Sequence, residues 1–217
     1  MKHRFHIALK NSVTLAIILL IILLIASIRS CLLKNESQFG NICSIFYQHP
    51  NWYSSSKNVQ DTWGIPISVQ MAILKQESSF NATARPPLFK LFGIPIGRKT
   101  SAYGYAQALN ETWHDYQKET RQVNAVRTSF NDSANFLGWY LHKIHHTLNI
   151  NANNAYALYL AYHEGIRGYE KSSFKHKKWL IHVADKVQHN ASIYHQQLLT
   201  CQNKLEQPTI WNKWMWV

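Results

Sequence analysis

The sequence predicts an all-α protein. Apolar residues recur at helical spacing in several long segments, and no segment alternates apolar and polar residues for long, as a strand would. Hydrophobic residues make up 46% of the chain, with 8 Trp and 11 Tyr, which supports a real core and excludes disorder for most of it. The length of 217 residues fits one sizeable domain together with an anchor.

The N-terminal region contains a candidate membrane anchor. Residues 11–28 carry no charge and are almost all Ile, Leu, Ala and Val. At about 1.5 Å per residue, this stretch nearly spans a hydrocarbon core of about 30 Å. Lys2, Arg4 and Lys10 precede it, so the N-terminus is predicted to be cytoplasmic and the rest to lie on the extracytoplasmic side of the membrane.

Two alternatives to a signal-anchor remain open. A cleaved signal peptide is one, although the apolar stretch is long for it and no small-residue cleavage site follows. A lipoprotein lipidated at Cys31 is the other, although Arg29 fits poorly in such a site. We favour the signal-anchor. The anchor and the lipoprotein both leave residues 32–217 tethered to the membrane.

The chain divides into four predicted parts. Residues 1–30 are a cytoplasmic stub and anchor, residues 31–62 are a linker and the start of the domain, and residues 63–204 are the main helical domain. Residues 205–217 are a Trp-rich tail, which either contacts the membrane interface or packs back on the domain.

Three cysteines allow one disulfide in an oxidising compartment. Cys43 lies near the start of the folded part and Cys201 near its end, so a bridge between them would strongly constrain the unfolded chain. We predict this bridge, with two buried thiols as the alternative. It leaves Cys31 unpaired, as lipidation or a free thiol would require.

The segment 65–80 is predicted to be the central helix. Pro66 suits its first turn, and Val69, Ile73 and Glu77 fall four apart on one face. Partial burial and the negative end of the helix dipole both raise the pKa expected for the Glu77 carboxyl. An acid still protonated near neutral pH is a proton donor suited to glycosidic-bond cleavage. The alternative is a side chain that reaches solvent past the helix end.

Three segments flank this helix. Residues 42–53 are short and aromatic, and residues 51–62 are loop-like. Residues 81–101 form a long irregular segment that carries two glycines and several prolines, and long loops inside compact domains tend to be functional. Four basic residues of this segment either border a groove for an acidic polymer or are solvated charge, namely Arg85, Lys90, Arg98 and Lys99.

Further helices follow a tight turn at residues 103–109, which is entered through Gly104. One helix is expected from residue 110 or 111 to 126, and another begins at Asp132 as N-cap and continues to residue 148. Asn153 or Asn154 caps a buried helix that Gly165 and Gly168 end. The last amphipathic helix runs from residue 179 or 180 to 201.

The net charge of +12 implies an anionic partner or surface. The basic residues are scattered and no nucleic-acid motif is present, so nucleic acid is not the expected partner. Phospholipid headgroups or an acidic cell-wall polymer are the remaining candidates.

Elimination of other chemistries leaves two carboxylates. No nucleophile motif and no Gly-rich phosphate loop is present. His142 and His146 are four residues apart but lack a third ligand in register, so we predict no metal and no cofactor. Glu77 and Glu164 are the candidates for acid–base work, although Glu164 could instead be a structural partner of nearby basic side chains.

Three segments together resemble the SLT-type lytic transglycosylases, which are related to goose-type lysozyme. Residues 77–80, ESSF, followed by Ala82 or Ala84, are similar to the family's E-S-x-F-x-x-x-A. Residues 101–107, SAYGYAQ, are similar to S-x-x-G-L-M-Q, and residues 161–165, AYHEG, to A-Y-N-A-G. Their order and rough spacing also match, over a region from about residue 63 to 169.

The resemblance implies a lysozyme-like domain that cleaves peptidoglycan without a metal, with Glu77 as the single catalytic acid–base. Glu77 would protonate the oxygen between MurNAc and GlcNAc and then take the proton of the MurNAc C6 hydroxyl, which gives a 1,6-anhydro end. Gln107 would bind the sugar, Tyr162 would hydrogen-bond or orient Glu77, and Ser78 would support the site. The predicted substrate-binding and supporting residues are Ser78, Ser101, Tyr103, Gln107, Tyr162, His163 and Glu164.

The departures from the family pattern put subsite details in doubt more than the reaction. Tyr105 and Ala106 replace Leu-Met, His163 replaces Asn, and the segment between the first two motifs is longer. Glu164 replaces a small residue, which leaves a hydrolytic muramidase conceivable. A catalytically silent peptidoglycan-binding component of an envelope-spanning assembly is the alternative from another class.

Overall fold

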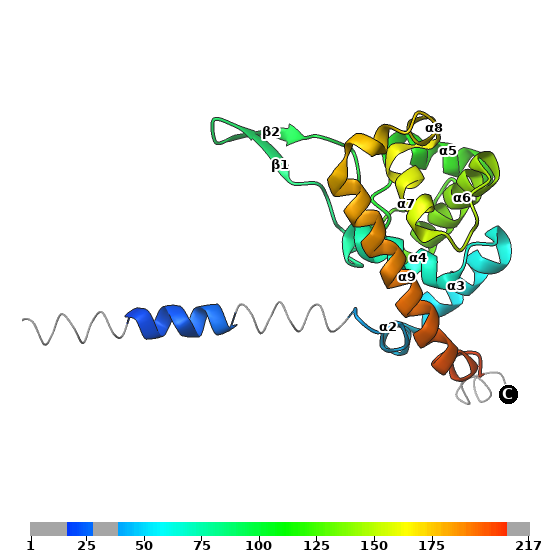
Figure 1. Ribbon diagram of the computed structural model, residues 1–217, viewed down its shortest axis with the longest axis horizontal. Helices are drawn as coiled ribbons and strands as arrows, with labels where there is room; N and C mark the ends of the chain where they lie inside the picture. The colour runs from blue at the N-terminus through cyan, green and yellow to red at the C-terminus, as the bar shows by residue number, and fades with distance from the viewer. Residues whose placement is uncertain (1–16, 28–38, 208–217) are drawn as a thin grey trace, which may run out of the picture. The chain divides into compact units, whose positions relative to one another are not determined.

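The computed structural model describes residues 17–27 and 39–207, in two units, Met1–Asn41 and Ile42–Val217 (Figure 1). In the first unit, residues 17–27 are helical. The predicted anchor at residues 11–28 lies partly outside the described residues, as do Cys31 and the tryptophans of the tail. Within the described ranges, no helix has both the length and the apolar character needed to cross a bilayer.

The second unit is mostly helical, which confirms the helical part of the predicted fold class. Its helices are α2 (Ile42–Gln48), α3 (Pro50–Trp63), α4 (Ile67–Ser78), α5 (Asn110–Thr120), α6 (Phe130–Leu148), α7 (Ala155–Glu164), α8 (Ile166–Glu170), the 3-10 helix η1 (Ser173–His176) and α9 (Lys178–Leu205).

Helix α9 organises the unit. Its 28 residues would extend about 42 Å at the usual rise of an α-helix. It packs along α4, α7 and α2, and Figure 1 shows it running obliquely across the domain. The buried side chains recur every three or four residues, so one face of α9 forms a wall of the core. These residues are Leu180, Ala184, Val187, Ala191, Tyr194, Leu198 and Cys201.

Helix α4 is the most deeply buried helix of the core. Its first eight residues, 67–74, are all buried, and it packs against α3, α6, α7 and α9. Pro66 immediately precedes the first helical residue, where its fixed φ and missing N–H are compatible with helix initiation. The helix ends when Ser79 adopts the left-handed conformation at φ 49°. Glu77 therefore lies in the last turn of a helix that four other helices pack against.

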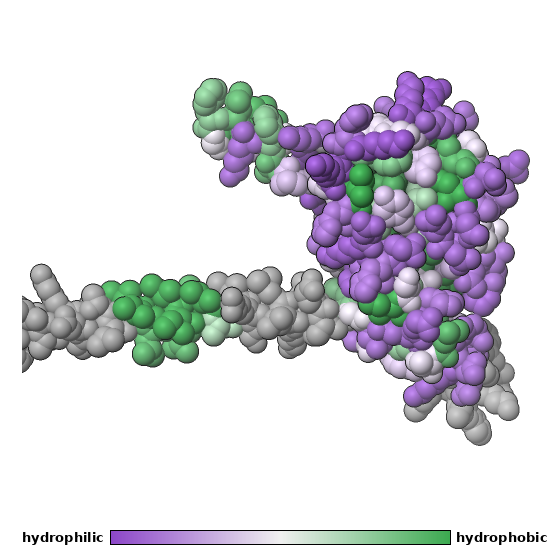
Figure 2. Space-filling view, in the orientation of Figure 1, coloured by the Kyte–Doolittle hydropathy of each residue, from purple (hydrophilic) through white to green (hydrophobic). Residues whose placement is uncertain are grey.

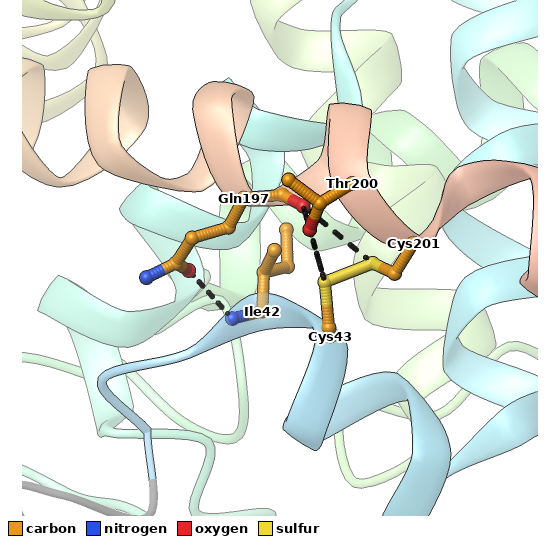
Figure 3. The surroundings of a disulfide bond; sticks show 5 residues. All are labelled: Ile42, Cys43, Gln197, Thr200 and Cys201. Carbon is orange, nitrogen blue, oxygen red and sulfur yellow. Dashed lines mark hydrogen bonds between the residues drawn. A yellow bond between two sulfur atoms is a disulfide. The ribbon is translucent and has the colours of Figure 1, made fainter.

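A disulfide joins α2 to α9 (Figure 3). Cys43 and Cys201 are 158 residues apart in sequence, with an S–S distance of 2.04 Å. The Ile42 N–H donates a hydrogen bond of 2.9 Å to the side-chain oxygen of Gln197 beside it. Closing a loop of this length lowers the entropy of the unfolded chain, which corresponds to about 5 kcal/mol in the chain-entropy model.

Residues 51–62, predicted to be a loop, belong instead to helix α3, so that prediction is wrong. Pro50 occupies the first turn, where a missing N–H costs nothing. The Ser55 hydroxyl donates to the Asn51 carbonyl at 2.9 Å, which satisfies a polar group inside the packed helix. Tyr53 and Val59 are buried on the same helix. Tertiary packing therefore overrides the weak helix propensity of the serine run.

Residues 81–101 are not wholly irregular, since they contain an antiparallel hairpin. Strand β1 (Leu88–Leu91) pairs with β2 (Ile94–Arg98) through a two-residue turn at Phe92 and Gly93, both with positive φ. A register shift interrupts the pairing after Phe89. All residues of both strands are exposed, so no buried face imposes the alternation that would have predicted them.

Helix boundaries were predicted with uneven success. Asn154 caps α7, and its side-chain oxygen accepts from the Ala157 N–H at 3.0 Å. The cap of α6 is Ser129 rather than Asp132, whose N–H donates to the Ser129 hydroxyl at 3.3 Å. Helix α5 ends at Thr120, six residues early, because Arg121 adopts the left-handed conformation.

Candidate active site

The carboxyl group of Glu77 lies at the junction of α4 and α7. The residue as a whole is half-buried, and its carboxyl group is surrounded by protein. Burial disfavours the charged form and raises the pKa of Glu77 from 4.5 to about 7. A hydrogen bond from Tyr159 acts in the opposite direction. A substantial fraction of Glu77 is therefore protonated at neutral pH.

Tyr159 is the hydrogen-bond partner of Glu77 that the sequence analysis missed. It belongs to α7, is only 4% exposed, and its hydroxyl bonds to the Glu77 carboxyl. Burial, followed by the charge of Glu77, raises the pKa of Tyr159 far above its usual range, so the phenol remains a donor. Its position three residues before Tyr162 places both on one helix face, and that spacing was the available signal.

Tyr162 lies close to Glu77 but has another hydrogen-bond partner. Its hydroxyl donates to the Ala106 carbonyl at 2.6 Å. Burial and then the nearby charge of Glu77 raise its pKa. Its ring meets the Tyr140 ring edge-on, with centroids 5.6 Å apart. Tyr162 therefore fixes the 103–108 turn against α7, whereas the predicted hydrogen bond to Glu77 comes from Tyr159.

The turn at residues 103–108 adopts a closed form, with a bridge between Tyr103 and Ala108. Gly104 has φ 77° and its N–H donates to the Ala84 carbonyl at 3.0 Å. Gln107 also has a positive φ, and its side-chain nitrogen donates to the carbonyls of Ala84 and Gly104, both at 2.9 Å. The amide oxygen is the part of Gln107 that can still accept from a ligand.

Arg127 is a second residue that the sequence analysis missed, since nothing in the pattern marked it. Its guanidinium donates to the carbonyls of Ser101 and Ala108 at 3.1 and 2.8 Å, and to the Asn110 side chain at 2.8 Å. The Ser101 hydroxyl accepts from the Asn110 N–H at 3.0 Å. Ser101 thus holds the start of α5, and Arg127 closes the turn from outside.

Tyr103 lies on the outer side of this turn. The guanidinium carbon of Arg85 is 3.9 Å from the centroid of its ring, and that of Arg127 is 5.4 Å away. Arginine over an aromatic face is attracted by the ring quadrupole. The contact joins the 81–101 segment to the turn, which gives Tyr103 a structural role.

Ser78 supports the helix end rather than contacting the acid directly. Its hydroxyl donates to the Leu74 carbonyl at 3.2 Å, one turn earlier in α4. The Leu74 carbonyl is also the usual intrahelical partner of the Ser78 N–H, so this bond satisfies the hydroxyl within the helix. Ser78 therefore keeps its hydroxyl on the helix backbone, and this bond does not reach the Glu77 carboxyl.

The pKa of Glu164 is shifted in the opposite direction from that of Glu77. Its side chain is only 4% exposed, and Lys177 donates to both of its oxygens at 2.7 and 2.9 Å. Ser173 and His163 also hydrogen-bond to it. Burial acts to raise the pKa of Glu164, but these three partners together lower it. Glu164 is therefore an ionised clamp between the end of α7 and the start of α9.

A pocket of about 250 Å³ lies beside the turn and the end of α7. It brings together four of the predicted residues, namely Gln107, Tyr162, His163 and Glu164, while Ser78, Ser101 and Tyr103 do not line it. Glu77 does not line this pocket, but its charge acts on Tyr162, which does. The other lining residues are Ala108, Leu109, Thr112, Phe136, Tyr140 and Gly165.

The histidine pair of α6 has no ligand set around it. The His142 ring nitrogen Nδ1 is 2.9 Å from the Trp63 carbonyl, and the rings of His142 and His146 are 4.3 Å apart. In the part of the chain that the structure describes, no group of three metal-ligating side chains occurs.

Comparison with known proteins gives one match. A family model described as "Transglycosylase SLT domain" matches residues 17–201, which is most of the chain. No curated protein and no solved structure matches the chain.

The first prediction concerns Gly104. A Cβ added there would lie 2.0 Å from the Arg127 carbonyl oxygen, and its φ is also positive. Gly64 has a similar φ of 72° but nothing within 4 Å of an added Cβ, so it is a matched control. We expect Gly64→Ala to cost about 1–2 kcal/mol of unfolding free energy through φ alone. Gly104→Ala should cost about 1–3 kcal/mol more, through the added overlap.

Urea unfolding at equilibrium measures both substitutions of this pair. Equal losses for Gly104→Ala and Gly64→Ala would mean that the turn does not press against Arg127.

The second prediction concerns the pH dependence of stability. Because the folded-state pKa of Glu77 is raised, its protonated form stabilises the fold fully below pH 4.5. This contribution is lost as the pH rises through about 7. Above pH 7 the loss is on the order of 3 kcal/mol, from about 1.4 kcal/mol per pKa unit.

Glu77→Gln is the matched control, because its amide is always neutral. The unfolding free energy of the unsubstituted protein should fall relative to this variant between pH 4.5 and 8. Parallel curves across that range would contradict the burial of the Glu77 carboxyl.

Proposed function

The chain belongs to the transglycosylase SLT domain family, and on that premise we propose that it cleaves peptidoglycan strands with Glu77 as the catalytic acid–base. The single observation that supports this role most strongly is the Glu77 carboxyl, whose pKa burial raises to about 7, next to Tyr162, which lines a pocket at the end of α7. A protonated carboxyl at neutral pH can give its proton to a glycosidic oxygen.

In the first proposed step, the Glu77 proton moves to the oxygen between MurNAc and GlcNAc as the bond to the anomeric carbon breaks. The developing positive charge on the sugar lies near the carboxylate that Glu77 becomes. Tyr159 stabilises that carboxylate, because its hydroxyl donates to the charged form. The buried surroundings keep the proton on Glu77 until the substrate oxygen is in reach.

In the second proposed step, the Glu77 carboxylate takes the proton of the MurNAc C6 hydroxyl. The C6 oxygen then bonds to the anomeric carbon, which gives a 1,6-anhydro end and regenerates the acid. The substrate supplies its own nucleophile, so no water is consumed. One carboxylate is sufficient for this sequence, whereas an inverting hydrolase needs a second at roughly 6.5–9.5 Å.

The surroundings of Glu164 favour this single-acid reaction over hydrolysis by a muramidase. Both of its oxygens accept hydrogen bonds from Lys177, and Ser173 and His163 also hydrogen-bond to the carboxylate. These bonds lower its pKa and leave it a weak base towards water. Glu164 is more suited to hold the end of α7 in place than to activate a nucleophile.

The pocket residues support the binding of a glycan strand. The Gln107 oxygen can accept from a sugar hydroxyl or an N-acetyl N–H, since its nitrogen is already bonded twice. His163 lies at the rim with its side chain 35% exposed. The net charge of +12 complements the carboxylates of peptidoglycan stem peptides.

The same proposal includes a location on the periplasmic side of the inner membrane. It is supported by the sequence of residues 11–28 and the cations before it, with lipidation at Cys31 as the alternative. The Cys43–Cys201 disulfide is consistent with an oxidising compartment. A tethered enzyme of this kind could act within an envelope-spanning assembly.

The test is digestion of purified sacculi followed by mass spectrometry of the released muropeptides. Glu77→Gln should lower release at least about 100-fold, which is the lower range for the loss of a general acid. Glu170→Gln makes the same chemical change at an exposed carboxylate of α8 and should retain full activity.

The product mass distinguishes the reactions. An anhydro product lies one water below a reducing one, so reducing ends would favour a muramidase and contradict the second step. Full activity of Glu77→Gln would end the assignment of the acid. Sacculus binding without any released muropeptide by the unsubstituted protein would favour a silent binding component.

A further inference from the structure

The hairpin β1–β2 has no role in the site described above. Figure 2 shows it as a hydrophobic projection that stands clear of the more hydrophilic body of the domain. Both strands are exposed along their whole length, so neither face packs on the domain. Phe92 at the turn is 95% exposed and Ile94 is 68% exposed. An exposed apolar surface of this kind marks an interaction site.

The charged residues of the hairpin and of the segments that flank it in sequence are all positive. Residues 81–110 contain no Asp or Glu, and their four cations are Arg85, Lys90, Arg98 and Lys99. Arg98 is bonded to the Pro86 carbonyl at the base of the hairpin, and the Lys99 ammonium lies 5.4 Å from the centroid of the Phe89 ring. The apolar tip is suited to the acyl chains of a lipid bilayer, and the cations behind the tip are suited to anionic headgroups above those chains.

We propose that the β1–β2 hairpin inserts its tip into the interface of an anionic phospholipid bilayer. Each arm has four or five residues, or about 13–17 Å at about 3.3 Å per residue, which is enough to bring the tip about 5–10 Å below the headgroup surface. The Lys90 and Lys99 side chains would extend back to the phosphates. This insertion would be a membrane contact of the second unit itself.

The two exposed faces favour a bilayer over the other possible occupants. A protein partner would cover one face of a two-stranded sheet, whereas lipid surrounds both. A glycan is recognised by hydrogen-bonding side chains together with aromatic faces. The hairpin, however, presents few hydrogen-bonding side chains, and its exposed apolar residues are four aliphatic ones and two phenylalanines, namely Leu88, Leu91, Ile94, Ile96, Phe89 and Phe92. The proposal does not depend on cleavage by Glu77.

The test uses the full chain with Cys31→Ser, so that an introduced cysteine is the one free thiol. Phe92→Cys is labelled with the environment-sensitive dye nitrobenzoxadiazole, and Val123→Cys, at a residue 70% exposed in the loop after α5, is the matched control. Vesicles contain phosphatidylcholine with phosphatidylglycerol, or phosphatidylcholine alone. Residues 11–28 are present in every variant, so the label reports the hairpin and not total binding.

We expect the label at position 92, and not at 123, to shift to the blue on anionic vesicles and to be quenched by spin-labelled lipids. The double substitution Lys90→Gln and Lys99→Gln should raise the anionic lipid concentration that gives half of this label response at least about tenfold. Each cation near an anionic surface contributes about 1 kcal/mol. Circular dichroism verifies that these surface variants remain folded.

Three results would overturn the proposal. They are an unchanged label at position 92 on vesicles that have bound the protein, an equal shift on neutral vesicles, and a shift on purified peptidoglycan in place of vesicles. Labelling in the Glu77→Gln background separates this result from the cleavage assay, because insertion should persist there even if the proposed reaction fails.

Discussion

Burial of the Glu77 carboxyl against α7 is the interaction on which the candidate site depends. The first eight residues of α4 lie in the core, so the position of its last turn is fixed by packing with α9, α7 and α3. That turn delivers a carboxyl to the Tyr159 hydroxyl. Burial raises the pKa, and the single hydrogen bond offsets only part of this effect, which leaves an acid poised near neutral pH.

The two carboxylates of the site differ because their surroundings differ. Glu77 has a neutral phenol as its hydrogen-bond partner and stays partly protonated at neutral pH, while Glu164 has Lys177 and stays ionised. One is therefore available as a proton donor, and the other holds the end of α7 to α9. Arg127 and the Tyr162 hydroxyl hold the 103–108 turn over this junction, which gives the pocket a fixed wall.

Helical periodicity predicted the elements that have one buried face, such as α9 and α6. The spacing of Val69, Ile73 and Glu77 predicted a carboxyl with a raised pKa in the last turn of α4. Periodicity could not find α3, whose serines are buried by tertiary packing, or the hairpin, which has no buried face. Tyr159 was missed because an aromatic residue in an apolar helix is usually core. The roles of individual site residues stay predictions, because the family match extends over residues 17–201 without assigning them.

Carbon-13 NMR titration of the Glu77 carboxyl tests the central claim most directly, with the Glu77→Gln spectrum used to assign the signal. A midpoint near pH 7 is predicted for the unsubstituted protein. Tyr159→Phe should raise it further by removing the donor to the charged form, and Tyr162→Phe should leave it nearly unchanged, because that hydroxyl bonds to Ala106. A midpoint near 4.5 in the unsubstituted protein would contradict the burial of the acid and the proton donor built on it.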